Sequence, residues 1–190
     1  SVGSHSLTAT YNGDTNFTAS TSPVDTQTVN QAATTTVLVS LPDPSVFGEA
    51  KTLTATVTAT APGVGIPTGT VDFFDGATLL GSAPLVGGVA TLSVSTLSVG
   101  THSLTATYNG DTNFTASTSP VDTQTVNEAS TTTVLVSLPD PSVFGEPKVL
   151  TATVTASAPG VGIPTGTVSF FDGATLLGTG TLSGGVATLT

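Results

Sequence analysis

Asparagine, aspartate and glycine are concentrated in the short segment YNGDTNF, which occurs at residues 11–17 and again at residues 108–114. Carboxylate and amide oxygens are ligands that calcium prefers. The candidate calcium ligands are Asp14, Asn16, Asp111 and Asn113. Calcium takes about six to eight oxygens, however, and each segment supplies one carboxylate. Asn-Gly also favours the left-handed conformations of a type I′ turn, and aspartate side chains bond their own backbone. We therefore expect a hairpin turn in both segments and no metal site.

Two further patterns in these segments have a chemical interpretation. Asn16 and Asn113 each begin an Asn-Phe-Thr triplet, which matches the glycosylation acceptor pattern, although so short a motif also occurs by chance. His102 alternates in phase with Leu104 and has no second histidine or cysteine near it in the sequence, so we expect a hydrogen-bonded structural histidine. A Ser-His-Asp triad lacks the Gly-x-Ser-x-Gly elbow that would present its serine. The sequence predicts no catalytic residue, and we expect the protein not to be an enzyme.

An internal repeat organises the whole chain. Matching residues such as His5 and His102 lie 97 residues apart, without insertion or deletion. This period exceeds the roughly 20–50 residues of a solenoid repeat and suits an independent domain with its own core. The repeat turns over after DTQTVNQ and DTQTVNE. We expect the last two strands of one domain at residues 1–32, a complete domain at residues 33–129, and the first five strands of a further domain at residues 130–190.

The composition excludes several classes of partner. The net charge is −10 with only two basic residues, so the chain presents no basic patch for nucleic acid or an anionic membrane. No apolar run approaches the ~20 residues that span a bilayer, and we expect no membrane insertion in this segment. The absence of cysteine excludes a disulfide framework and a thiolate metal site. We expect no cofactor.

Alternation of apolar and polar residues with a period of two is the dominant pattern. In KTLTATVTAT, residues 51–60, Leu53, Ala55 and Val57 fall on one face and threonines on the other, as in a half-buried strand. Turn sequences rich in Gly, Pro, Asn and Asp separate such segments. The predicted strands of one repeat span residues 34–41, 51–60, 69–74, 78–82, 89–96, 102–108 and 115–126. About seven strands per 97-residue repeat favour an all-β fold of tandem immunoglobulin-like antiparallel β-sandwiches.

Three segments together resemble the bacterial Ig-like repeat of the Big_3 type. They are TTTVLVS at residues 34–40, GTVDFFDG at residues 69–76, and the long segment from LLGSAP to TASTS at residues 79–119. The resemblance covers the whole chain, and Ser169 at the position of Asp72 is a minor departure from it. Such repeats are strung in tandem in large secreted or surface-attached bacterial proteins, as stalks, adhesin extenders or structural modules without catalytic residues. The resemblance therefore implies an extracellular location, at the bacterial cell surface.

The resemblance also raises the question of a covalent cross-link. Some bacterial Ig-like pilin domains join a buried lysine to an asparagine. Lys51 and Lys148 are the only lysines, and Asn30 and Asn127 end the last strand of each repeat. Lys51 opens a strand, however, where a side chain is normally solvated, and the cross-link also needs a buried carboxylate. We expect no isopeptide bond.

The near-identity of the two copies favours a structural role, because selection for a binding site tends to differentiate one copy. Residues 1–32 and 130–190 together make up one sandwich, short by about four residues of the repeat. Identical units are therefore the expected partners, either as a continuous longer chain, which we favour, or by strand addition between separate chains. The alternative function is an adhesin that binds a ligand through its loops, with APGVGIP at residues 61–67 as the candidate surface. A third possibility is a spacer in an enzyme whose catalytic domain lies elsewhere.

Overall fold

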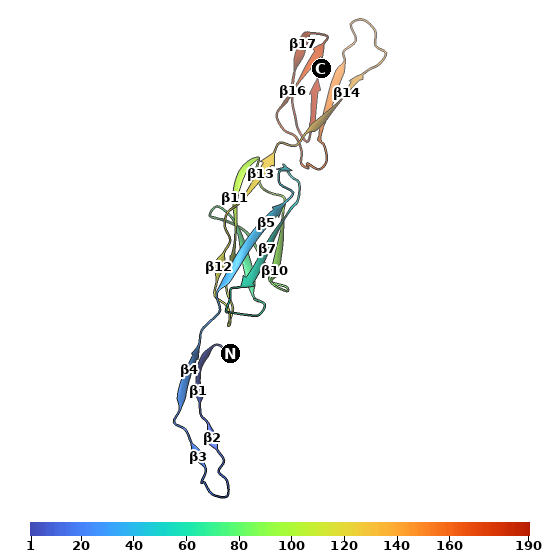
Figure 1. The fold of residues 1–190 in the computed structure, drawn as a ribbon. Coiled ribbons are helices and arrows are strands. Elements are labelled where there is room, and N and C mark those ends of the chain that lie inside the picture. The colour runs from blue at the N-terminus through green and yellow to red at the C-terminus, as the bar shows by residue number, and fades with distance from the viewer. The chain divides into compact units, whose positions relative to one another are not determined.

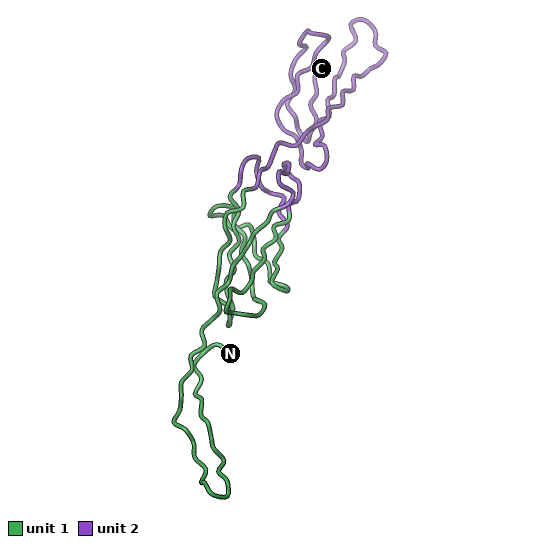
Figure 2. The backbone as a smooth tube through the Cα atoms, in the orientation of Figure 1, with its two compact units in different colours: residues 1–40, 52–92, 103–123 green, residues 41–51, 93–102, 124–190 purple.

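The computed structural model describes all residues from 1 to 190, in which β-strands β1 to β18 are joined by turns and loops without any helix (Figure 1). The backbone divides into two compact units (Figure 2). One comprises residues 1–40, 52–92 and 103–123, and the other comprises residues 41–51, 93–102 and 124–190. Because this division passes through strands, the strands are described below repeat by repeat.

Residues 1–32 form a hairpin of four short strands. These are β1 (Gly3–Leu7), β2 (Thr10–Tyr11), β3 (Ser20–Thr21) and β4 (Asp25–Val29). β1 pairs antiparallel with β4, with Gly3 opposite Val29 and Leu7 opposite Asp25, and β2 pairs with β3. No other strand pairs with the hairpin. The hairpin side chains that match inward-facing residues of the complete repeat therefore have no second sheet to pack against.

Strands β5 to β13 form a two-sheet sandwich. The first sheet has the order β10-β7-β5, and the second has the order β6-β13-β11-β8-β9, with β12 also pairing with β11. The bounds are β5 (Thr34–Leu41), β6 (Ser45–Val46), β7 (Lys51–Ala59), β8 (Thr70–Asp75), β9 (Thr78–Pro84), β10 (Val89–Val94), β11 (Gly100–Tyr108), β12 (Ser117–Thr118) and β13 (Asp122–Asn127).

The core of this sandwich consists of the inward-facing residues of both sheets. Leu53 and Val57 of β7 are buried, as are Phe73 of β8 and Leu104 and Tyr108 of β11. The outward positions of β7 are mostly threonines, which are exposed or half-buried. The predicted period of two is thus confirmed on β7, and with it the all-β sandwich.

Residues 130–190 contain strands β14 (Thr131–Leu138), β15 (Val149–Ala156), β16 (Thr167–Asp172), β17 (Thr175–Thr181) and β18 (Val186–Leu189). The sheet β14-β15-β18 has the same order as β5-β7-β10 of the complete repeat. The pair β16-β17 corresponds to β8-β9 and carries the same bulge, between Phe170 and Phe171. The counterparts of β11, β12 and β13 do not occur in this part of the chain.

Two details of the complete repeat differ from the predicted strands. The predicted strand 115–126 is interrupted, since residues 119–121 separate β12 from β13 and include Pro120, which has no backbone N–H to donate. A short strand that the sequence did not indicate begins at Ser45, the last residue of the turn sequence PDPS. In this strand, β6, Ser45 and Val46 pair in parallel with Val126 and Asn127.

Candidate functional site

The predicted calcium ligand Asp111 is fully engaged in holding a loop. Its Oδ1 accepts hydrogen bonds from the backbone N–H groups of Asn113 at 2.8 Å and Phe114 at 2.9 Å. Its Oδ2 accepts from the Thr68 backbone N–H at 2.9 Å and from the Thr68 hydroxyl at 2.6 Å. Partial burial acts to raise the pKa of Asp111, but these bonds, above all that from the Thr68 hydroxyl, lower it to about 2. The carboxylate therefore closes the loop and bonds it to Thr68.

The predicted type I′ turn at Asn109-Gly110 is wrong. A type I′ turn needs positive φ at both central residues, whereas only Gly110 has one, at 81°. The physical reason is that Asp111 organises a longer loop, in which its backbone N–H also donates to the Phe114 carbonyl at 3.0 Å. The copy at residues 11–17 folds in the same way, since Asp14 accepts from the backbone N–H groups of Asn16 and Phe17 at 2.7 and 2.8 Å. These two bonds lower the pKa of Asp14.

The other sequence-predicted residues lie apart from one another. Asn16 and Asn113 are exposed on their loops. His102 is almost buried, and its Nε2 donates to the Ser98 carbonyl at 2.8 Å, in keeping with a structural histidine. Groups of three or more His, Asp or Glu that could hold a metal ion do not occur in the chain.

Lys51 departs from the expectation of a solvated side chain, because it is 0% exposed. The first position of β7 is in phase with Leu53 and Val57, so the strand directs this side chain inward. Its Nζ donates to the Glu49 carbonyl at 3.0 Å, and burial lowers the pKa of the ammonium group. Asn127, the residue considered as its cross-linking partner, is exposed, and so is Lys148. The two lysines thus have opposite environments despite matching positions in the repeat.

The loop at residues 61–67 exposes Val64 and Ile66 and borders a shallow groove with Gly87 and Gly88. Part of the loop is committed to packing, however. A Cβ at Gly63 would lie 2.5 Å from that of Ala32, and one at Gly65 would lie 3.0 Å from the Phe114 ring. Gly160 in the second copy of the loop approaches Ala129 with the same 2.5 Å clearance. The identity of the two loops thus has a structural reason, namely close packing against the residues between repeats.

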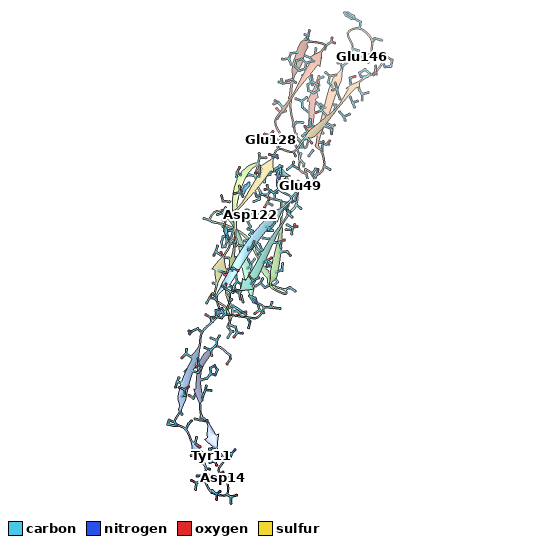
Figure 3. All side chains as sticks on the ribbon, viewed as in Figure 1. Tyr11, Asp14, Glu49, Asp122, Glu128 and Glu146 are labelled. Atoms are coloured by element: carbon cyan, nitrogen blue, oxygen red, sulfur yellow. The ribbon has the colours of Figure 1, made fainter.

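A further candidate surface lies on residues 1–32 and 130–190. Leu104 and Tyr108 are 0% exposed in the complete sandwich, whereas their copies Leu7 and Tyr11 are 51% and 46% exposed. Figure 3 shows Tyr11 and Asp14 near the turn of the N-terminal hairpin. On the other incomplete repeat, Leu135 is 57% exposed, although Leu38 at the matching position is 6% exposed. The same sequence is therefore core in one place and surface in another.

A set of polar contacts joins β5 and the segment after it to β13 in the complete sandwich. The Ser40 hydroxyl donates to Asp122 Oδ2 at 2.5 Å. Gln124 Nε2 donates to the Pro42 carbonyl at 3.0 Å. In the incomplete repeats the matching acceptors and donors are separated, because Asp25 and Gln27 lie on the N-terminal hairpin and Ser137 and Pro139 lie on the C-terminal part.

Sequence reasoning missed this set of contacts. Gln124 is 0% exposed and lies in the inward phase of DTQTVN together with Val126. A glutamine at an inward position of a strand implies buried hydrogen-bond partners, because a buried polar group is costly without them. That signal is present in the sequence, but the identity of the partners is not.

Comparison with known proteins gives a family. The family model described as bacterial Ig-like domain (group 3) matches residues 38–127 and 135–190. A solved structure of fibronectin(III)-like modules of CbhA from Clostridium thermocellum is similar at 22% identity, with a TM-score of 0.36, over 48% of this chain and 94% of that chain. No curated protein matches. The chain contains no helix with the length and apolar character to cross a membrane.

Proposed function

Since the chain belongs to the bacterial Ig-like domain family, we propose that it is a non-catalytic structural module of a long extracellular tandem array at the bacterial cell surface. The array is a fibre or stalk in which each incomplete end domain is completed by the neighbouring unit. The observation that carries this proposal is the exposure of Leu7, Tyr11 and Leu135 at positions whose copies are buried in the complete repeat. The boundaries of the units are those of the repeat, at residues 1–32, 33–129 and 130–190.

Identical units suit this role better than a catalytic one. The copies share their loops as well as their cores, and the aspartates of the YNGDTNF segments close their own loops. Bacterial Ig-like domains are generally non-catalytic modules, in keeping with a structural role. Each module adds on the order of 30–40 Å of length, because a ten-residue strand spans about 33 Å.

The test is to extend the chain after Thr190 with a copy of residues 94–129, which supplies the absent strands. We expect amide hydrogen exchange in residues 131–189 to slow by orders of magnitude, because the inward faces become buried. The matched control carries the same extension with aspartate at the position of Leu104. Unchanged exchange in the extended chain would contradict the proposal that neighbouring repeats complete these domains.

A second experiment tests whether tandem repeats form an extended stalk or fibre. Chains with one, two and three further repeats are compared by small-angle X-ray scattering. We expect the maximum dimension to grow by a constant increment per repeat. Repeats that fold back on one another would give a smaller increment with each addition, and that result would contradict a stalk or fibre.

The alternative function is an adhesin or ligand-binding module. The observation that favours it is the exposure of Val64 and Ile66 on the loop at residues 61–67. Replacing both by serine leaves the core intact, so loss of binding to a cell-surface component with unchanged thermal unfolding would support adhesion. Unchanged binding, or no binding by either protein, favours the structural role.

A further inference from the structure

We propose that the open face of residues 130–190 binds the hairpin β1–β4 of a second copy of this chain, so that copies join head to tail. The inference rests on the proposed structural function and names the partner for that function. It also names the register, because the complete repeat contains the same strands already assembled.

The acceptor, residues 130–190, has an unpaired strand edge at the position where the partner would bind. In the complete repeat β8 pairs on one side with β9 and on the other with β11, with Ala106 opposite Phe73 and Tyr108 opposite Val71. β16 keeps the β9-like partner β17, but its other edge is unpaired. The matching register places Ala9 of the second copy opposite Phe170, and its Tyr11 opposite Val168.

The donor hairpin, β1–β4, is already folded in the isolated chain. β1 and β4 are already paired, with Gly3 opposite Val29, so the second copy brings two strands that are already in register with each other. Pre-ordered partners lose less conformational entropy on binding than disordered ones. The side chains that would become buried include Leu7, Tyr11 and Phe17, which are exposed on the isolated hairpin.

The polar contacts of the complete repeat give the interface its specificity. Thr68 donates to Asp111, Ser40 to Asp122, and Gln124 to the Pro42 carbonyl. The equivalent pairs join Thr165 to Asp14, Ser137 to Asp25, and Gln27 to Pro139, and each has one member on each copy. A donor hairpin in any other register would leave these groups unpaired as they become buried, which is unfavourable.

The second copy is preferred to an unrelated partner because the side chains named above have their matching partners within this chain. Each copy carries one donor hairpin and one acceptor face, and the two are different surfaces. A contact between different surfaces of identical copies propagates, which gives an open chain of copies instead of a closed dimer. Strand addition at a sheet edge supplies the backbone hydrogen bonds for such a contact.

One position departs from the match. Gln31 Nε2 donates to the Asp111 carbonyl at 2.7 Å, but the equivalent residue in the second repeat is Glu128. An ionised glutamate has no proton to donate to the Asp14 carbonyl of the second copy. Glu128→Gln restores the donor, and we expect it to tighten association by roughly 2- to 10-fold, the effect of one net hydrogen bond.

The decisive experiment traps the predicted register with a disulfide, which the cysteine-free chain permits. Thr107 lies opposite Asp72 in the complete repeat, so Thr10 of one copy is predicted to lie opposite Ser169 of another. Opposite residues of an antiparallel pair have Cα atoms about 5.5 Å apart, within the range of a disulfide. We expect the T10C/S169C chain to give a ladder of disulfide-linked oligomers under mild oxidation. The matched control is S6C/S169C, in which the first cysteine is displaced by about 13 Å along the strand.

The disulfide pattern and the sedimentation result together test the proposed head-to-tail contact. A ladder in T10C/S169C but not in S6C/S169C, with a rise in mass on sedimentation of the unmodified chain, supports the inference. Equal ladders from both variants, or a disulfide closed within one chain, would overturn it. A monomeric unmodified chain would also overturn it, while slowed exchange in the extended chain would leave the proposed tandem array standing.

Discussion

Asp111 illustrates how one carboxylate can organise a loop and connect it to a neighbouring strand. Its four hydrogen bonds come from the backbone N–H groups of Asn113 and Phe114 and from the N–H and hydroxyl of Thr68. Asp14 has the two bonds within its own loop but none from a threonine. Thr68 therefore supplies two bonds that Asp111 has and Asp14 lacks, and the repeat provides an internal control for them.

We expect Asp111→Ala to lower the free energy of unfolding of the complete sandwich by about 1–2 kcal/mol, as for the loss of a helix-capping side chain. Because the folded-state pKa of Asp111 is lowered to about 2, its contribution is present above pH 4 and is lost as the pH falls toward 2. Urea denaturation at pH 7 and pH 2.5 measures both effects. Asp14→Ala is the control and should leave this transition unchanged.

The burial of Lys51 opposes folding at neutral pH. Burial lowers the pKa of its ammonium group, so the protonated form that predominates at neutral pH is destabilised by folding. A lysine with a lowered folded-state pKa favours folding most above its unfolded pKa of about 10.5, and this advantage is lost as the pH falls. We expect Lys51→Met to raise the free energy of unfolding on the order of 1 kcal/mol at pH 7.

The control for this substitution is Lys148→Met, because Lys148 is exposed. The gain from Lys51→Met should shrink between pH 7 and pH 11, and chemical denaturation across that range tests it. A gain that is independent of pH would mean that side-chain packing, and not the charge, limits the stability of this position.

At the scale of the strand, burial depends on whether a second sheet is present. β11 and the hairpin strands β1 and β2 have nearly the same sequence, but only β11 packs against a second sheet. We expect Leu104→Ala to lower the free energy of unfolding by about 2–5 kcal/mol, as for leucine truncation in other cores. Leu7→Ala, at the matching position, should change the unfolding of the isolated chain by less than about 0.5 kcal/mol. Equal effects of the two substitutions would contradict an unsupported hairpin.

Alternation explains why the strands were predictable. The inward phase of β7 and of β11 is apolar over several residues, and period-two sequences of that length determine the strand and its buried face. The strand β6 was not predictable, since Ser45 and Val46 are extended through their pairing with Val126 and Asn127 of β13. The conformation of Asn109 was predicted wrongly because Asn-Gly preferences apply to two-residue hairpins, whereas Asp111 creates a longer loop here.

The candidate surfaces were predictable only in part. The repeat predicts that residues 1–32 and 130–190 are parts of domains like the one that lies between them. The inward position of Lys51 follows from its phase with Leu53, but its burial depends on the chain around Glu49. Contacts such as Ser40 to Asp122 join residues about eighty positions apart, which no local pattern can pair.

At the scale of the whole molecule, the charge of −10 governs how copies associate. Copies with so few cations repel one another, and salt screens the repulsion by shortening the Debye length from about 30 Å at 0.01 M to about 8 Å at 0.15 M. We therefore expect the dissociation constant of head-to-tail association to fall several-fold over that range, as measured by sedimentation. The chain with Glu128→Gln has one negative charge fewer and should respond less. Weakening by salt would point to attractive ion pairs, which two lysines can hardly supply.

Because the two lysines have opposite environments, cleavage by trypsin should depend on whether the last domain has been completed by a neighbouring unit. Trypsin cuts after lysine and arginine, and this chain offers it only Lys51, which is buried, and Lys148, which is exposed. A solitary chain should therefore be cleaved once, into fragments 1–148 and 149–190. When the last domain is completed, Lys148 takes the place that Lys51 has in the finished sandwich, and the protease loses its remaining site. Protease resistance would then appear only when a neighbouring unit is in place.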